Sequence, residues 1–256
     1  MNGGTKPAEL AALRQRLAHI ERGGQTEAPG LPFGVAAIDA VLPGGGLARG
    51  ALHEIHGLGA AEEEGAEAAA FLAGILARLE PGRPVLWCLA GADLYAPGLA
   101  ACGLAPERLL LVRAPERALL WTMEEGLKCR ALAAVVGEVE ALPGTASRRL
   151  QLAAEATGVT AFALHRRRRA ALAGTEEPTA ALTRWRVAAA PSLPAEGPGL
   201  GRPLWNVELL RSRGGLPGRW LVEACDAAGC LRCRRNPHAN WPQRSNAAPE
   251  RSGSRR

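Results

Sequence analysis

One glycine-rich stretch decides the fold of this 256-residue chain: Leu42-Pro43-Gly44-Gly45-Gly46-Leu47-Ala48-Arg49-Gly50-Ala51-Leu52-His53-Glu54-Ile55-His56-Gly57. Its glycines predict a turn, because glycine adopts the left-handed backbone conformations that many turns need. The aliphatic residues that follow predict a short strand over 52–56, and a helical pattern begins a few residues later. This order of turn, strand, glycine and helix is typical of the segment that carries a phosphate-binding loop.

The chemistry of such a loop is missing. A Walker A motif reads G-x-x-x-x-G-K-[ST], in which the lysine meets the phosphates and the hydroxyl holds magnesium. When Gly57 is taken as the first glycine, the last three positions hold Glu62, Glu63 and Glu64. These carboxylates suit the start of a helix but would repel a triphosphate. We therefore expect the architecture of a nucleotide-binding domain without its chemistry: no cofactor, no catalytic residues and no ATP hydrolysis.

Composition supports a globular protein with a basic end. Hydrophobic residues make up 47% of the chain and charged residues 22%, which is usual for a globular protein. The segment 229–256 contains seven arginines and one glutamate and so accounts for the whole net charge of +6. Lysine occurs only at positions 6 and 128.

The same sequence predicts a cytoplasmic protein without a membrane partner. It has no run of about 18 apolar residues, and its N-terminus lacks the apolar segment of a signal peptide. The six cysteines do not follow a disulfide-scaffold pattern, which agrees with a reducing compartment.

Strand and helix patterns alternate along most of the chain. Apolar strands separated by helices predict an α/β fold with a mostly parallel sheet covered by helices, and the later strands predict a C-terminal antiparallel β appendage. The expected strands are 52–56, 84–89, 108–112, 131–136, 159–164, 182–188, 204–211 and 219–224. The expected helices are 6–22, 62–80, 94–102, 115–128 and 145–157.

The N-terminal helix candidate carries a narrow apolar stripe at spacings of three and four residues. A glycine-rich linker separates it from the rest of the chain. The stripe either packs on its own domain or docks on a partner. Its members are Leu10, Leu13, Leu17 and Ile20.

The order of these elements resembles the RecA-type ATPase core, and several blocks resemble the ImuA family more closely, over roughly residues 31–224. This family of RecA-like proteins, often labelled SulA-like, comes from bacterial damage-inducible mutagenesis operons. Besides the stretch quoted above, the blocks are Asp93-Leu94-Tyr95-Ala96-Pro97-Gly98-Leu99, Arg184-Trp185-Arg186-Val187, Glu208-Leu209-Leu210-Arg211 and Trp220-Leu221-Val222-Glu223.

The resemblance implies a role in translesion synthesis beside an ImuB-like protein and an error-prone DnaE-type polymerase, with RecA as a further candidate partner. The sequence as a whole predicts four parts, of which the end after Gly229 has no counterpart in the resemblance. These are an N-terminal helix and linker (1–30), a RecA-like core with a degenerate P-loop (31–180), a β-hairpin appendage (181–228) and a basic disordered tail (229–256).

Two further places merit attention in a RecA-like core. An acidic residue should follow the fourth strand, where Glu138 and Glu140 occur, and we interpret both as solvated acids. His165 ends the last parallel strand, at the edge where open α/β sheets bind ligands. It precedes a basic run that is a candidate contact for DNA or an acidic partner: Arg166, Arg167, Arg168 and Arg169.

No metal site is expected. Cys225, Cys230, Cys233 and His238 offer zinc-type ligands, but their spacing fits no familiar closed site, so incidental thiols are the favoured interpretation. His53 and His56, three residues apart on a strand, should face opposite sides of the sheet.

Three functions remain open. The favoured one is a non-catalytic adaptor in a mutagenic translesion complex, which needs a stable scaffold and a docking surface. Tryptophans of the β-rich part are candidate anchors for a partner, although we expect at least two of them to be buried in the core of the domain itself: Trp185, Trp205 and Trp220. The alternatives are a RecA-type ATPase or recombinase, against which the glutamates at 62–64 speak, and a SulA-like inhibitor of cell division.

Overall fold

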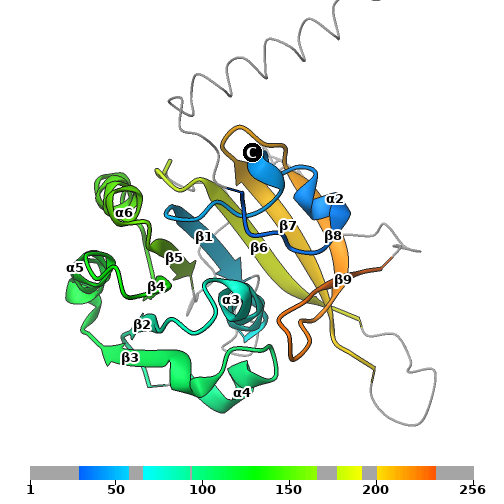
Figure 1. Cartoon of the computed structure of the whole chain (residues 1–256), viewed down its shortest axis with the longest axis horizontal. Helices are drawn as coiled ribbons and strands as arrows, with labels where there is room; N and C mark the ends of the chain where they lie inside the picture. Colours follow the sequence, from blue (N-terminus) through cyan, green and yellow to red (C-terminus); the bar gives the residue numbers. More distant parts are fainter. Residues whose placement is uncertain (1–28, 58–65, 93, 166–177, 192–200, 235–256) are drawn as a thin grey trace, which may run out of the picture.

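The computed structural model describes residues 29–57, 66–92, 94–165, 178–191 and 201–234. Within them the chain forms one nine-stranded sheet in the order β3-β2-β4-β5-β1-β6-β7-β8-β9, flanked by helices (Figure 1). The predicted α/β fold, with a mostly parallel sheet and antiparallel strands near the C-terminal end, is confirmed.

Six strands form the parallel part of the sheet. β1 lies in its middle, between β5 and β6, so that its side chains have neighbours on both sides. The strand at 183–190, which the sequence assigned to an appendage, is therefore the sixth parallel strand. The six are β1 Leu52–Gly57, β2 Val85–Leu89, β3 Leu109–Arg113, β4 Ala134–Val139, β5 Thr160–His165 and β6 Thr183–Ala190.

The remaining strands run antiparallel and extend the same sheet. β7 (Leu204–Ser212) pairs with β6, β8 (Gly218–Glu223) returns alongside β7, and the short β9 (Arg232–Cys233) pairs with β8. Residues 229–234 thus belong to described structure, and the expectation of a disordered tail from residue 229 is wrong for them. The rest of the predicted tail lies outside the described residues.

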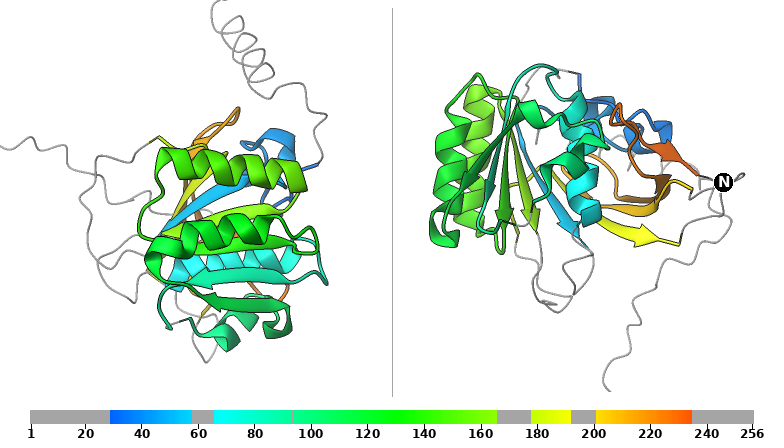
Figure 2. Two further views of the ribbon diagram at one scale, coloured as in Figure 1. Left: turned by 90° about the vertical axis from the view of Figure 1, so that its left-hand side faces the viewer. Right: turned by 90° about the horizontal axis from the view of Figure 1, so that it is seen from below.

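Helices cover the two faces of the parallel part (Figure 2). α3 (Ala66–Arg78) packs on β1 and β6 on one face, and α4 (Ala96–Ala100) lies beside it. α5 (Glu116–Leu127) packs on β4 and β2 on the opposite face, next to α6 (Gly144–Thr157). Gly158 ends α6 in a left-handed conformation (φ 79°), as a glycine after a helix commonly does. The remaining short helices are α2 Ala36–Asp39, η1 Pro43–Gly45 and η3 Pro106–Arg108.

Each face has its own apolar core, because successive residues of a strand point to opposite faces. The α3 face contains large side chains such as Phe71, Trp87 and Trp185, all fully buried. The α5–α6 face contains Leu52, Met123 and smaller residues. Two of the predicted partner anchors, Trp185 and Trp205, are buried in the first core, and Trp220 packs partly against it. Their burial makes Trp185 and Trp205 structural residues.

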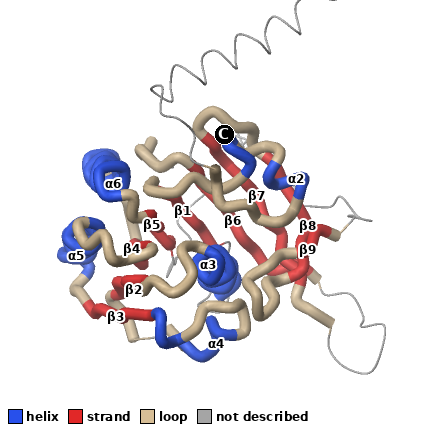
Figure 3. The backbone as a smooth tube through the Cα atoms, viewed as in Figure 1, coloured by secondary structure: helices blue, strands red, loops and turns tan. Residues whose placement is uncertain are grey.

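The quoted glycine-rich stretch closes onto the start of the described chain. Leu31 and Leu47 form an antiparallel bridge, and a Cβ on Gly46 would come within 2.5 Å of the Leu31 backbone. Only glycine allows this approach, which is one physical reason for the residue at that position. The turn leads the backbone directly into the middle strand β1 (Figure 3).

The outer strand β3 leaves apolar side chains exposed on the surface of the described structure. Leu110 and Leu111 are about half exposed there. Trp121 on α5 is also exposed. Among the described residues, no helix is both long and apolar enough to span a membrane.

Candidate functional site

Strand β1, which precedes the predicted P-loop position, carries a buried polar cluster. Gly57 is the last residue of β1 and is half-buried. Glu62, Glu63 and Glu64 lie outside the described residues, so their position stays a prediction. Just before Gly57, the side chains of Glu54 and His56 point to the α5–α6 face of the sheet, near the carboxyl ends of β1 and β5.

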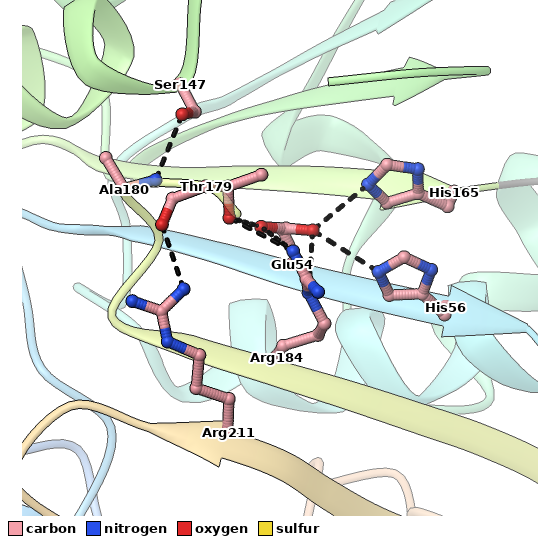
Figure 4. A network of polar contacts seen from close by, with 8 residues as sticks. All are labelled: Glu54, His56, Ser147, His165, Thr179, Ala180, Arg184 and Arg211. Atoms are coloured by element: carbon pink, nitrogen blue, oxygen red, sulfur yellow. Dashed lines mark hydrogen bonds and ion pairs between the residues drawn. The ribbon is translucent and has the colours of Figure 1, made fainter. Parts of the chain in front are cut away.

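Glu54 is the centre of this cluster (Figure 4). Its carboxylate is 1% exposed and accepts hydrogen bonds from Arg184, with Nε 3.1 Å from Oε2 and Nη2 3.3 Å from Oε1. Register explains the pair, since β1 and β6 place Glu54 directly beside Arg184. Thr179 donates its hydroxyl to Oε1 of the same carboxylate.

The network extends to the elements around it. Arg211 on β7 donates to the carbonyl of Thr179 at 2.9 Å, and Ser147 of α6 accepts from the amide of Ala180 at 3.0 Å. Thr179 and Ala180, which lie shortly before β6, are thus tied to β7 and α6 respectively.

The environment keeps Glu54 ionised. Burial alone would raise its pKa, but contacts from His165, His56 and Thr179 and the charge of Arg184 outweigh burial and hold the pKa of Glu54 well below its usual range. A buried carboxylate with this many partners is a permanent negative charge at the edge of the sheet.

Two histidines from neighbouring strands face that charge. His56 on β1 and His165 on β5 are register partners, and their rings stack with centroids 4.1 Å apart and planes 5° from parallel. Nε2 of His56 lies 3.3 Å from Oε2 of Glu54, and Nε2 of His165 lies 3.5 Å from the same atom. Both rings are buried.

His53 lies on the other face of β1, as its spacing from His56 predicted. Its Nδ1 is 2.7 Å from the hydroxyl of Thr183, its Nε2 is 2.9 Å from the carbonyl of Ala48, and its ring packs on Phe162. Burial lowers its pKa from 6.5 to about 4, although the Ala48 contact partly opposes this shift.

This lowered pKa predicts acid sensitivity. Between pH 6.5 and about 4 the unfolded chain binds a proton at His53 that the folded chain does not, so stability rises with pH across that window. We expect the free energy of unfolding to fall by about 3 kcal/mol as the pH is lowered from 6.5 to 4. Denaturant titrations at several pH values measure this. His53→Gln should flatten the dependence, and an equally steep slope in that variant would assign it to other groups.

The acids after the fourth strand differ from expectation. β4 begins three residues later than predicted and includes Glu138, which is buried and accepts a hydrogen bond from the Trp87 indole at 2.9 Å. The interpretation of Glu138 as a solvated acid was therefore wrong, because β4 extends past Gly137 and holds Glu138 inside the sheet. Glu140 is exposed, as expected.

Some of the remaining predicted site residues lie within the described parts of the chain and others do not. The apolar stripe, the basic run and the candidate zinc-ligating histidine lie outside the described residues. They are Leu10, Leu13, Leu17 and Ile20, then Arg166, Arg167, Arg168 and Arg169, and finally His238. Cys225 is buried, Cys230 half-buried and Cys233 exposed. Within the described ranges, the residues grouped closely enough to hold one metal ion are Glu54, His56 and His165, and no cysteine belongs to such a group.

Sequence reasoning singled out His165 and the strand of Glu54 but missed the cluster. The available signal was Glu54 itself, since a carboxylate inside a strand predicted to be buried requires a partner. Its partner Arg184 is 130 residues away in the sequence, and only strand pairing brings the two together. The cluster offers carboxylate oxygens, imidazole nitrogens, a guanidinium and the hydroxyl of Thr179.

Comparison with known proteins gives a clear match. The chain is 44% identical over 216 residues to Protein ImuA of Caulobacter vibrioides strain NA1000 / CB15N, an alignment that covers 81% of this chain and 88% of that protein. Protein ImuA of Caulobacter vibrioides strain ATCC 19089 / CIP 103742 / CB 15 matches to the same extent. No family profile matches the chain.

Proposed function

This chain belongs to the ImuA family, and on that basis we propose that it acts in SOS-induced, error-prone translesion DNA synthesis as a non-catalytic, RecA-like adaptor. The proposed partners are an ImuB-like protein and a DnaE-type polymerase, with RecA as a further candidate. In this role the sheet serves as a scaffold that brings other proteins together.

The observation that carries the non-catalytic part is the chemistry at the end of β1. Phosphoryl transfer depends on a lysine and a magnesium-binding hydroxyl at this place. The sequence supplies neither in the Walker positions. Lys128 lies on the surface after α5, where it pairs with Glu125, and Lys6 lies outside the described residues. The groups that converge beside the P-loop position are instead Glu54, Arg184 and two imidazoles.

Exposed apolar side chains support the role of an interaction protein. The outer strand β3 presents Leu110 and Leu111, and Trp121 is 61% exposed on α5. Unpaired edge strands and surface tryptophans commonly serve protein contacts. The apolar stripe at Leu10 and the basic run that begins at Arg166 remain proposed contacts for a partner and for DNA, respectively.

The test is whether the complex forms without nucleotide. We expect the full chain to copurify with the ImuB-like protein and the polymerase after apyrase treatment, and to show no saturable ATP binding by calorimetry in the presence of magnesium. Restoring a Walker pattern through Glu62→Gly, Glu63→Lys and Glu64→Thr should not by itself produce ATPase activity. Micromolar ATP affinity, or ATP-dependent filaments of the chain alone, would favour the ATPase alternative. Capture of a cell-division protein in place of the polymerase would favour the SulA-like one.

A further inference from the structure

Three ligating atoms of the polar cluster converge on one point. Figure 4 shows the imidazoles of His56 and His165 side by side, each with a ring nitrogen directed at the carboxylate of Glu54. The side chains come from the adjacent strands β1 and β5, so the backbone hydrogen bonds of the sheet hold their spacing. We infer that Glu54, His56 and His165 bind one divalent ion of the zinc class.

The spacing of the atoms fits tetrahedral zinc. Zn–N and Zn–O bonds of about 2.0–2.1 Å place neighbouring ligand atoms of a tetrahedron roughly 3.3–3.4 Å apart. The two Nε2 atoms lie 3.3 Å and 3.5 Å from Oε2 of Glu54. One ligand atom from each of the three residues lies within 4.8 Å of the others. Small shifts of the side chains suffice to place an ion among them.

A second observation points to a ligand at the same place. Nε2 of His165 is buried, and its approach to Glu54 Oε2 at 3.5 Å is too long for a well-formed hydrogen bond, so among the described residues it is one of three buried side-chain polar atoms that lack one. A buried polar atom of this kind costs free energy unless a ligand or water satisfies it. A metal ion bonded to the Nε2 lone pair would remove that cost.

The surroundings of Glu54 resemble the outer shell of a metal site. Ligating carboxylates are usually held by further hydrogen bonds that set their orientation. Oε1 receives Thr179 and Nη2 of Arg184, while Oε2 faces the two imidazoles and Nε of Arg184. The guanidinium charge beside the carboxylate weakens attraction to a cation, so affinity should be moderate for a zinc site.

The donor set selects the metal. Imidazole nitrogens suit zinc, whereas magnesium and calcium prefer oxygen ligands alone. Three protein ligands leave the fourth tetrahedral position to water or a group from outside the cluster. The site does not depend on the proposed adaptor role, because it is built from side chains of the fold itself.

The test measures zinc binding to the full chain after chelator treatment. Zinc is titrated against a competing chelating dye, and Co²⁺ serves as an absorption probe of tetrahedral geometry. Three proteins are compared: the natural chain, His56→Gln/His165→Gln, and Cys230→Ser/Cys233→Ser. The cysteine variant is the matched control, because Cys230 and Cys233 are the more accessible of the three described thiols near the C-terminal end, where Cys225 is buried.

We expect one zinc per chain in the natural protein and in the cysteine variant, and affinity at least about 100-fold weaker in the histidine variant. The tetrahedral Co²⁺ bands should follow the same pattern, and millimolar Mg²⁺ should not displace zinc. If the histidine double variant does not fold, His165→Gln alone is used, with thermal unfolding as the check. No zinc binding by the natural chain, or binding lost only with the cysteines, would overturn the proposal.

Discussion

Replacing Glu54 with glutamine is expected to lower the free energy of unfolding by about 3–5 kcal/mol, because the change removes the carboxylate that pairs with the buried guanidinium of Arg184. Both side chains are buried, and the guanidinium makes two hydrogen bonds to the carboxylate. Glutamine keeps the shape of the side chain, so the loss reflects charge and not packing. Chelator-treated protein is used in denaturant titrations, so that metal binding does not contribute.

A surface acid provides the matched control for this change. Glu80 pairs with Arg49 at 2.7 Å and with Arg83 at 3.7 Å, but its side chain is about one third exposed. Glu80→Gln should therefore cost less than about 1 kcal/mol. Adding Arg184→Gln to the Glu54 variant removes the buried guanidinium that has lost this carboxylate and should restore part of the loss. Equal losses of unfolding free energy in Glu54→Gln and Glu80→Gln would contradict a larger contribution from the buried Glu54–Arg184 pair.

Truncating Trp185 to alanine is expected to cost about 3–5 kcal/mol, the usual loss for a fully buried aromatic side chain. Its ring lies 5.1 Å from that of Phe33 and 5.8 Å from that of Phe71, between α3 and the sheet. Its indole donates a hydrogen bond to Thr183 at 2.8 Å. A cavity here would loosen the junction of the parallel and antiparallel parts. The midpoint of thermal unfolding should fall by about 10 °C.

Trp121→Ala is the matched control, since it removes the same side chain from a position 61% exposed. Its effect on stability should stay within about 0.5 kcal/mol. Similar losses in the two variants would contradict the burial of Trp185. If Trp121→Ala keeps full stability but weakens partner capture, that result would support the adaptor role through a surface residue.

Local patterns predicted most of the strands and helices. Helix 62–80 was predicted from apolar residues at helical spacing, and α3 buries those same residues over Ala66–Arg78. The order of strands and helices predicted a parallel sheet because parallel strands need a crossover between them. The exact start of β4 could not be predicted, since Ala131 and Leu132 are as apolar as the residues that follow.

The C-terminal end of the described chain shows how tertiary contacts override composition. The polar, arginine-rich sequence after Ala227 predicted disorder, yet Gly229 packs against α3, and its Cβ position would lie 2.5 Å from the carbonyl of Gly74. β9 then pairs with β8. Backbone hydrogen bonds, the close contact of Gly229 and the burial of Leu231 in the core stabilise this segment, and a single buried leucine leaves no hydrophobic pattern in the sequence.

The sequence by itself determined the α/β class, the turn before β1, the family resemblance and the absence of a Walker lysine, because each depends on residues close together in the chain. Only the tertiary structure decided that Glu54, His56, His165 and Arg184 form one cluster. The sheet order places β1 between β5 and β6, and strand register then brings side chains more than a hundred residues apart into contact. Such pairing depends on long-range packing, which no local pattern of residues records.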